Sequence, residues 1–376
     1  MAGAPRSVVL AANSLWNIAN FRSGLIRALK DAGYRPLVIA PRDETVAARL
    51  SELEIEQIDL PVQRSSLNPL ADLSLYRRYR SLLGQVRPVA LLSFTIKPNI
   101  YGSLAATSLG IPAIPNVSGL GTPFIRGGAL QFFVAGLYRR AFAKVPMVFF
   151  QNPDDQQLFT ALGITDAGKS KVLPGSGINL DRFAPTPLPD GAPVFLLISR
   201  LLGDKGVREY VEAARQLHRY LPDARFQLLG PIDAGNRTAI GRVELDRWVG
   251  EGLVDYLGVT DDVRPYIAAA SAIVLPSYRE GLPRTLLEGA AMARPLIAAD
   301  VPGCREVIAD GANGYFCRAH DPASLAVALS KFAALNPGER QAMGEASRRL
   351  VQERFSEDIV ISAYLGELAR LQASPD

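Results

Sequence analysis

The chain has 376 residues, and at roughly 100 to 200 residues per domain this length predicts two domains. Hydrophobic residues make up 48% of the sequence and charged residues 21%, which excludes an intrinsically disordered chain. The formal net charge of +4 conceals a division, because residues 1–185 carry 20 basic and 12 acidic side chains whereas residues 186–376 carry 21 and 25.

The first half alternates short apolar runs with helix-like segments. The apolar runs have the length of buried strands, and one helix-like segment stops at a glycine. In chain order we predict strand Ser7–Ala12, helix Gly24–Ala32, strand Tyr34–Ala40, helix Glu44–Leu53, helix Leu75–Gln85, and strands Pro88–Phe94, Ile111–Asn116 and Val145–Gln151. This alternation indicates βαβ units, and therefore a parallel sheet covered on both faces.

A segment rich in proline and glycine, Phe183–Pro193, is typical of a linker and precedes a second series. Its predicted elements are strand Val194–Ser199, helix Gly206–Tyr220, strand Arg225–Leu229, helices Arg242–Gly250 and Val263–Ala270, strand Ala272–Pro276, helix Arg284–Ala293, strand Pro295–Ala299, and helices Cys304–Ala309, Pro322–Leu335 and Glu357–Leu371. Both halves are therefore α/β. We divide the chain into domains of residues 1–185 and 186–355 and a C-terminal helix within 356–376, which could pack on either domain, including back on the N-terminal one. A ligand crevice is expected between the domains, at the carboxyl ends of the strands.

From Leu73 to Pro153 the chain contains no acidic residue at all. The basic residues in this stretch are Arg77, Arg78, Arg80, Arg87, Lys97, Arg126, Arg139, Arg140 and Lys144. This bias favours a face for an anionic ligand or an anionic membrane over an ordinary solvated surface. The most apolar window, Ala129 to Phe150, is interrupted by three of these cations, so we expect it to lie on a bilayer and not to cross one.

Cysteines and histidines are scarce in this sequence. Cys304 and Cys317 are too few for a disulfide framework, and His218 and His320 are not spaced as metal ligands. We therefore expect packed cysteines, no zinc-type site, and His218 on a solvated helix face. The polar N-terminal segment is not typical of a signal peptide, which together with the cysteine usage favours a cytoplasmic location.

The loops that follow the first strand of each half exclude two common nucleotide motifs. They read ANSLWNIANFRSG and SRLLGDKG, and neither contains G-x-G-x-x-G or G-x-x-x-x-G-K-[ST]. The sequence therefore argues against a nicotinamide dinucleotide site and against a P-loop nucleotide site.

Two glutamates, Glu280 and Glu288, are separated by about two helical turns in AIVLPSYREGLPRTLLEGAAMARPLIA. Spacing alone would favour two exposed glutamates on a helix surface. The segments before Glu280 and after Glu288 are apolar, however, and a buried carboxylate needs a polar partner. Ribose and hexose hydroxyls can supply such partners.

Arg200 and Lys205 lie between a predicted buried strand and a helix that begins near Gly206. Two cations beside a helix N-terminus suit a phosphate group, although an exposed Arg and Lys flanking a turn is the alternative. Gly281 allows the backbone N–H groups of a second helix N-terminus to approach an anion closely. Two anion sites beside two carboxylates suit a sugar joined through a diphosphate to a nucleoside.

Together, SRLLGDKG, SYREGLPRTLLEGAAMARP and DGANGYF (Asp310–Phe316) resemble the retaining glycosyltransferases of family 4. The resemblance implies a GT-B fold, in which two Rossmann-like domains face each other across a cleft. It also implies that Arg200 and Lys205 hold the donor diphosphate, that Glu280 contacts the transferred sugar, and that Glu288 contacts the ribose. The backbone of Gly281, Leu282 and Pro283 would approach the sugar and phosphates. By this resemblance Glu280, Arg200 and Lys205 are the catalytic group, and neither a metal nor a cofactor is required besides the UDP-sugar donor.

The N-terminal motifs NFRSGLIRALKDAG, SFTIKPNIYG and IPNVSGLGTPF resemble bacterial hexosaminyl transferases that extend polyprenyl-diphosphate-linked sugars. Arg22 and Lys97 are candidates for the acceptor diphosphate, and Asn20 and Asn99 for sugar hydroxyls. The alternatives are a helix cap for Asn20 and a rim charge for Lys97. A loop containing Gly119, Gly121 and Thr122 either closes over the sugar or forms a plain turn.

The resemblance is incomplete at one position, because many relatives place a histidine in the N-terminal domain and this domain has none. We expect the leaving phosphate of the donor to accept the proton instead.

The sequence therefore predicts an enzyme that transfers a sugar, an N-acetylhexosamine or a related hexose, from a UDP-sugar to an undecaprenyl-diphosphate-linked saccharide. It would act on the inner face of the cytoplasmic membrane and touch that surface through four cations: Arg126, Arg139, Arg140 and Lys144. A soluble transferase with a small acceptor, and a non-catalytic sugar-nucleotide-binding protein, are the alternatives. No nucleic-acid partner is expected.

Overall fold

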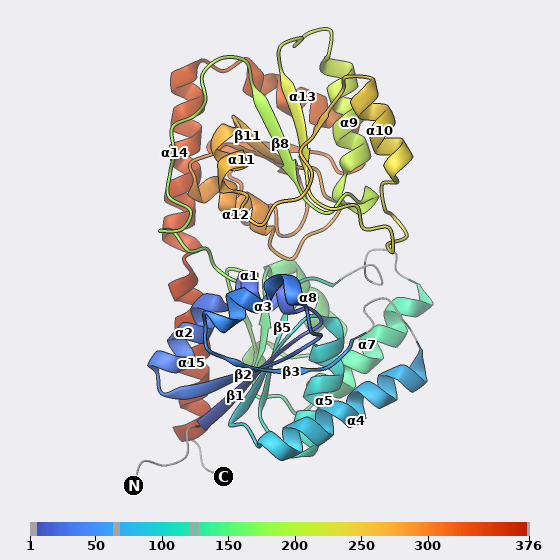
Figure 1. The fold of residues 1–376 in the computed structure, drawn as a ribbon, viewed down its shortest axis with the longest axis vertical. Helices are drawn as coiled ribbons and strands as arrows, with labels where there is room; N and C mark the ends of the chain where they lie inside the picture. Colours follow the sequence, from blue (N-terminus) through green and yellow to red (C-terminus); the bar gives the residue numbers. More distant parts are fainter. Residues whose placement is uncertain (1–5, 63–67, 121–123, 125–127, 374–376) are drawn as a thin grey trace. The chain divides into compact units, whose positions relative to one another are not determined.

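The computed structural model describes residues 6–62, 68–120, 124 and 128–373 (Figure 1). The chain forms two compact units, one of Met1–Gly177 with Glu357–Asp376 and one of Ile178–Ser356. Each unit is a parallel α/β sheet with helices, as the sequence predicts.

In the described part of the first unit, seven parallel strands pair in the order β3-β2-β1-β4-β5-β6-β7. Their bounds are β1 Arg6–Ala12, β2 Tyr34–Ala40, β3 Glu56–Asp59, β4 Ala90–Phe94, β5 Ala113–Val117, β6 Val148–Phe150 and β7 Ser170–Val172. The central strands β1, β4 and β5 are almost wholly buried, which explains why they are continuous apolar runs in the sequence. The strand order reverses between β1 and β4, so a ligand crevice is expected at their carboxyl ends.

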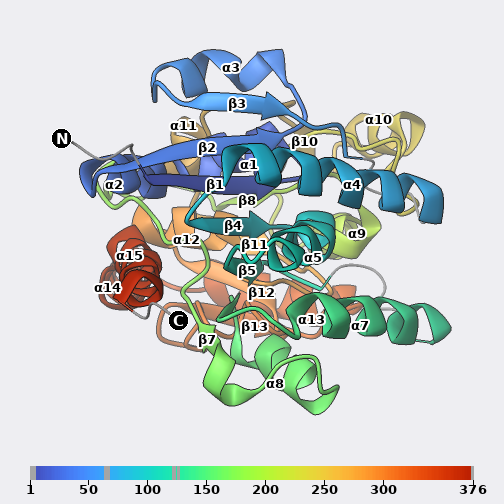
Figure 2. The same ribbon diagram turned by 90° about the horizontal axis from the view of Figure 1, so that it is seen from below.

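Helices cover both faces of this sheet, and each face has its own core. The helices of the first unit are α1 Leu15–Phe21, α2 Ser23–Asp31, α3 Glu44–Ser51, α4 Pro69–Val86, the π-helix η1 Pro98–Gly102, α5 Ser103–Ser108, α7 Ala129–Phe142, α8 Pro153–Ala161, the short 3-10 helix η2 Ala167–Lys169 and α15 Glu357–Ala373. One core packs under α4, α5, α7 and α8, and the other under α1, α2, α3 and α15. Figure 2 shows α4, α5 and α7 on the opposite side of the sheet from α2 and α15.

The C-terminal helix α15 contributes to the core of the first unit. The ring of Tyr364 lies edge-on to Phe94 and Phe149, and its hydroxyl accepts a hydrogen bond of 2.9 Å from the amide of Asn116. Val360 and Leu368 are buried beside it. The last helix therefore packs with residues that precede it by more than two hundred positions.

In the second unit the strand order is β10-β9-β8-β11-β12-β13, again all parallel. The strands are β8 Val194–Ile198, β9 Arg225–Leu229, β10 Asp255–Tyr256, β11 Ala272–Leu275, β12 Leu296–Ala299 and β13 Gly314–Cys317. The helices are the 3-10 helix η3 Gly203–Lys205, α9 Val207–Leu217, α10 Arg242–Gly250, α11 Arg264–Ala269, α12 Arg284–Ala291, α13 Pro322–Ala333 and α14 Pro337–Arg354. Here the order reverses between β8 and β11.

In this unit one predicted element is absent and one long helix was missed. The predicted helix Cys304–Ala309 is wrong, because residues 302–307 form turns. The side-chain amide of Asn313 accepts from the N–H of Ala309 at 2.7 Å and donates to the carbonyl of Val307 at 2.9 Å. The side chain therefore bonds to backbone groups that would pair with neighbouring turns in a helix. Helix α14, with 18 residues, was not predicted.

The two units divide earlier in the chain than the proline-rich segment suggests. Arg294 is fully buried and donates to the carbonyls of Thr186 and Pro187 at 3.0 and 2.8 Å. Burial lowers its pKa to about 10. Arg348 donates in the same way to the carbonyl of Phe183 at 2.9 Å. Residues 178–187 are therefore held by the second unit, and the division lies between 177 and 178 instead of 185 and 186.

Candidate active site

In the second unit, the two predicted donor loops follow β8 and β11, the neighbouring strands between which the order reverses. The loop after β8 contains Lys205 and the loop after β11 contains Glu280. The carboxyl ends of such strands form the usual ligand crevice of an open parallel sheet. The topology therefore places both loops where a ligand is expected.

Gly206 brings these two loops into direct contact. Its φ is +72°, and a Cβ at this position would lie 2.1 Å from the carbonyl oxygen of Pro276. The N–H of Tyr278 donates to the carbonyl of Asp204 at 3.0 Å across the same contact. Only glycine allows this approach, because any side chain would overlap with the backbone of the other loop.

Lys205 and Glu280 form an ion pair and a hydrogen bond across the two loops. The lysine side chain is 23% exposed and the glutamate side chain 13%, so the pair is largely shielded but reachable from solvent. Attraction between such charges is stronger than on an open surface. The structure thus brings two predicted site residues together.

Glu288 lies on α12 and is buried, as the apolar context of the motif suggests. The guanidinium of Arg284, one turn earlier, donates to its carboxylate at 3.0 Å. Burial raises the pKa of Glu288, and the charge of Arg284 opposes that rise. Arg284 was not predicted as a site residue, although its i, i+4 spacing to Glu288 is visible in the sequence.

The backbone before α12 suits an anion. Gly281 and Pro283 are buried and Leu282 is half-buried, and Pro283, the N-cap residue of the helix, makes no side-chain cap bond. Gly303, which sequence reasoning missed, supports this loop. Its φ is +83°, and a Cβ there would lie 2.5 Å from the carbonyl oxygen of Gly281 and 2.8 Å from that of Glu280.

Arg200 follows β8 but has a different partner from Lys205. Its guanidinium donates to the carboxylate of Asp233 at 2.8 Å, and its side chain is 54% exposed. Cys304 and Cys317 are buried packing residues and His218 is exposed, as predicted.

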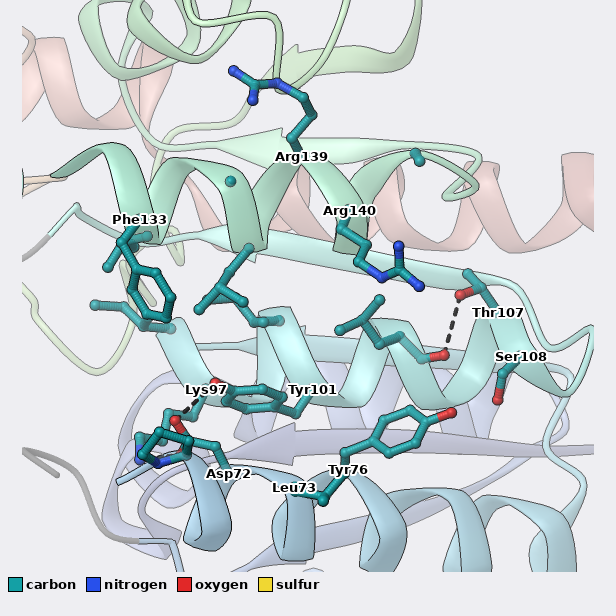
Figure 3. Close-up of a pocket in the computed structure, with 18 of the residues that line it drawn as sticks. Asp72, Leu73, Tyr76, Lys97, Tyr101, Thr107, Ser108, Phe133, Arg139 and Arg140 are labelled. Carbon is teal, nitrogen blue, oxygen red and sulfur yellow. Dashed lines mark hydrogen bonds and ion pairs between the residues drawn. The ribbon is translucent and has the colours of Figure 1, made fainter. Parts of the chain in front are cut away.

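In the first unit, Lys97 is already paired. It donates to Asp72 at 2.7 Å, and the hydroxyl of Tyr101 donates to the other oxygen of the same carboxylate at 2.8 Å (Figure 3). Both charged side chains are largely buried, at 12% and 15% exposure. Asp72 lies just before the stretch without acidic residues. No pattern in the sequence indicates that it pairs with Lys97.

The other acceptor candidates have mainly structural contacts. Asn99 is buried and donates to the carbonyl of Asn116 at 2.8 Å. Asn20 donates to the carbonyl of Trp16 at 2.9 Å, within α1. The buried guanidinium of Arg22 lies 4.1 Å from the centre of the Phe94 ring.

The predicted glycine loop is only partly visible. Gly119 has a φ of +143°, whereas Gly121 and Thr122 lie outside the described residues. Thr95, which sequence reasoning missed, directly follows β4 and has a φ of +92°, a strained value for a β-branched residue. Its hydroxyl accepts from the N–H of Asn13 at 3.1 Å, which joins the loops after β1 and β4.

The proposed membrane cations differ in their surroundings. Arg139 points away from the groove of Figure 3 and donates to the carbonyls of Leu162 and Gly163 at the end of α8, at 2.6 and 3.2 Å. Arg140 and Lys144 are exposed and line that groove, and Arg126 lies outside the described residues. Within the described ranges, no helix has the length and apolar character needed to cross a bilayer.

Comparison with known families decides the class of the protein. Residues 192–334 match the family model "Glycosyl transferases group 1", and residues 18–175 match "Glycosyl transferase 4-like domain". The chain belongs to these glycosyltransferases. The matches cover the unit that contains Lys205, Glu280 and Glu288 as well as the unit with the basic stretch.

Two solved structures and one curated protein illustrate the likeness. The glycosyltransferase is 29% identical over 368 residues to the N,N'-diacetylbacillosaminyl-diphospho-undecaprenol alpha-1,3-N-acetylgalactosaminyltransferase of Campylobacter jejuni, covering 93% of this chain and 94% of that one. Its fold matches Anabaena Alr3699/HepE in complex with UDP and glucose (TM-score 0.79, 18% identity, 97% and 99% coverage). It matches sucrose-phosphate synthase of Thermosynechococcus elongatus equally well (TM-score 0.79, 19% identity, 98% and 100% coverage). The fold is therefore the expected GT-B fold.

Proposed function

We propose that this glycosyltransferase moves a sugar, an N-acetylhexosamine or a related hexose, from a UDP-sugar to an undecaprenyl-diphosphate-linked saccharide during assembly of a surface polysaccharide or glycan. The observation that carries the proposal is the meeting of Lys205, Glu280 and the N-terminus of α12 at the β8–β11 reversal. The similarity to the Campylobacter transferase over almost the whole chain supports the acceptor class.

In the proposed reaction, an acceptor hydroxyl oxygen forms a bond to the anomeric carbon while the bond from that carbon to the diphosphate oxygen breaks. The electron pair of the broken bond goes to UDP. The charge of Lys205 and the N–H groups before α12 stabilise that negative charge, so no metal is needed.

The proton of the acceptor hydroxyl passes to an oxygen of the leaving phosphate, on the same face of the sugar, so the configuration is retained. Glu280 accepts hydrogen bonds from hydroxyls of the transferred sugar, and Glu288 from the ribose. Arg200, held by Asp233 in the absence of donor, moves to the diphosphate when the donor binds.

For the acceptor, the largely buried Lys97 lies after β4, near the strand reversal of the first unit. A bound diphosphate would be a second anion beside Lys97, while Tyr101 continues to donate to Asp72. Arg140 and Lys144 support a peripheral position on the anionic inner face of the cytoplasmic membrane.

A transferase with a small soluble acceptor is the second candidate, since the fold matches sucrose-phosphate synthase as well as it matches the Anabaena protein. The cationic stretch without acids favours the lipid-linked acceptor, because a small acceptor, even one with a single phosphate, can contact only a few of those charges. A non-catalytic sugar-nucleotide sensor is a weaker candidate, because it would not need an intact Lys205–Glu280 pair.

A transfer assay tests the proposal. Purified protein is incubated with UDP-N-acetylgalactosamine, UDP-N-acetylglucosamine or UDP-glucose, and with either an undecaprenyl-diphosphate-linked monosaccharide or fructose 6-phosphate. We expect mass spectrometry to show one added sugar on the lipid-linked acceptor alone, and none with Lys205→Ala. Transfer to the sugar phosphate alone would favour the small-acceptor enzyme, and donor binding without any transfer would favour the sensor.

A further inference from the structure

A groove of 1160 Å³ lies in the first unit between α4, α7 and the segment η1–α5 (Figure 3). Its lining is mainly apolar, with Tyr76, Ile100, Leu104 and Leu137 contributed by all three elements. Among the described residues that line it, Asp72 is the one carboxylate, and its charge is balanced by Lys97. The other charged lining residues, Arg139, Arg140 and Lys144, lie on α7 or just after it, so the middle of the groove is uncharged and suits an apolar chain.

The two ends of the groove lie toward opposite edges of the sheet. Lys97 follows β4, so it lies toward the carboxyl edge of the sheet, where the acceptor is expected. Helix α5 then runs back to Ser108, toward the edge where β5 begins, and the C-terminal half of α7 runs to the same edge. Figure 3 shows Lys97 at one end of the groove and Arg140 with Ser108 at the other. A chain lying in the groove would connect the acceptor site with these outer cations.

Large apolar side chains are exposed where α4 and α7 begin, near the Lys97 end. Phe132 and Phe133 are 72% and 59% exposed, and Leu70 and Leu73 are 77% and 44% exposed. Exposed aromatic and aliphatic side chains grouped on one surface are typical of contact with lipid. Such a surface is expected to be covered when the protein works.

We propose that this groove binds the isoprenoid chain of the acceptor lipid, an inference that rests on the proposed function. The diphosphate lies at the Lys97 end, and the first isoprene units lie on the apolar floor. Arg140 and Lys144 at the other end meet anionic headgroups of the membrane from which the lipid comes. The apolar floor matches an isoprenoid chain and the cations at the outer end match anionic headgroups. At the other end, Lys97 matches the diphosphate once its pair with Asp72 opens.

Gly136 offers a way to block the groove without disturbing the fold. It lies on α7, lines the groove, and a Cβ there would meet no atom within 4 Å. Gly136→Phe should therefore fill the groove. Gly366→Phe is the matched control, because Gly366 is exposed on α15, also has no atom within 4 Å of a Cβ, and is not among the groove residues. Circular dichroism and thermal unfolding establish that both variants are folded.

The experiment measures affinity for geranylgeranyl diphosphate and for inorganic diphosphate by calorimetry, with the full-length protein. We expect the wild type and Gly366→Phe to bind the prenyl probe at least tenfold more tightly than the inorganic one, because burial of the chain releases water. In Gly136→Phe this ratio should fall below threefold. Equal affinity for the two probes in the wild type would overturn the inference, as would an equal ratio in the two variants.

Two further measurements keep the inference testable if Gly136→Phe does not fold. A prenyl diphosphate with a terminal photoreactive group should label peptides from α4, α5 or α7 of the wild type, and labelling elsewhere would contradict the groove as its site. Displacement of the prenyl probe by dihexanoyl-phosphatidylglycerol, a water-soluble lipid used below its micelle concentration, would show that the groove takes acyl chains and would overturn the isoprenoid assignment. Because no sugar or donor is present, these results are independent of the transfer assay.

Discussion

The ammonium group of Lys205 donates a hydrogen bond to the carboxylate of Glu280, from a loop 75 positions away in the chain. Each side chain balances the charge of the other in a partly buried setting. A bound diphosphate would offer Lys205 a second anion and leave Glu280 to accept from sugar hydroxyls. Under the proposed function, the pair is a preorganised part of the donor site.

Removal of the lysine should abolish most of the activity. We expect Lys205→Ala to lower kcat/KM for the UDP-sugar by about a hundredfold or more, in the range known for loss of one preorganised electrostatic contact. Lys171→Ala, at an exposed lysine on β7, should retain wild-type kinetics. A Lys205→Ala enzyme within threefold of the wild type would contradict the role of this residue.

Gly303 allows a separation of backbone strain from steric overlap. Gly303→Ala and Gly311→Ala both place a Cβ at positive φ, +83° and +76°, which costs about 1–2 kcal/mol in each case. Only the first also brings the Cβ to 2.5 Å from the carbonyl of Gly281. We expect Gly303→Ala to lose at least ten times more kcat/KM than Gly311→Ala, measured at saturating acceptor. Equal losses in the two variants would show that Gly303 does not position the loop.

The buried carboxyl of Glu288 should make stability depend on pH. Its pKa in the folded chain is raised above the ordinary value of 4.5, so the folded state binds this proton more tightly than the unfolded state does. The free energy of unfolding of the wild type, measured relative to that of Glu288→Gln, should therefore fall as the pH rises from 4.5 to the raised pKa. Above the raised pKa this difference should stay constant. Urea titrations of both proteins across this range test the sign. Parallel curves would mean that the carboxyl has the same pKa in both states.

Membrane binding should depend on Arg140 and Lys144. Their double reversal to Glu should weaken binding to phosphatidylglycerol vesicles at least tenfold in a flotation assay at moderate salt, since each cation near an anionic surface contributes about 1 kcal/mol. Arg139 is unsuitable for this test, because its reversal would also break its bonds to the end of α8. Reversal of the exposed Lys171 and Arg219 gives the same change in charge and should have little effect. If the wild type does not bind vesicles at all, the peripheral-membrane assignment fails.

Chelation of metals should leave the transfer rate unchanged. In the proposed mechanism, Lys205 and the N–H groups before α12 supply the positive charge for the leaving diphosphate. The rate is measured with excess EDTA and again after addition of Mg²⁺. A loss with EDTA that Mg²⁺ restores would contradict the metal-independent mechanism.

The sequence was most informative where local pattern and burial coincide. The predicted strands are present in both units because their apolar runs form the centres of parallel sheets, and the buried setting of Glu288 follows from the apolar residues around it. Helix α14 was missed because its apolar positions are sparse, but a local signal was available. Asn336 and Glu339 form a capping box around Pro337, which marks the start of a helix.

Pairings between distant segments were out of reach of the sequence. The partner of Lys97 is Asp72, at the start of a helix whose first residues were not predicted as helical. Gly303 contacts the Glu280 loop only because β12 lies beside β11, and its role is visible only through the close approach of two backbones. Contacts of this kind depend on strand order, which local periodicity does not determine.

The return of α15 to the first unit has a consequence for the order of folding. Residues 178–356 are continuous and form their own core, so this unit can fold as soon as it leaves the ribosome. The first unit, although synthesised earlier, lacks Tyr364 and its neighbours until the last helix emerges. Its apolar face under α15 is exposed during that interval, so the half of the enzyme made first is the half that is completed last.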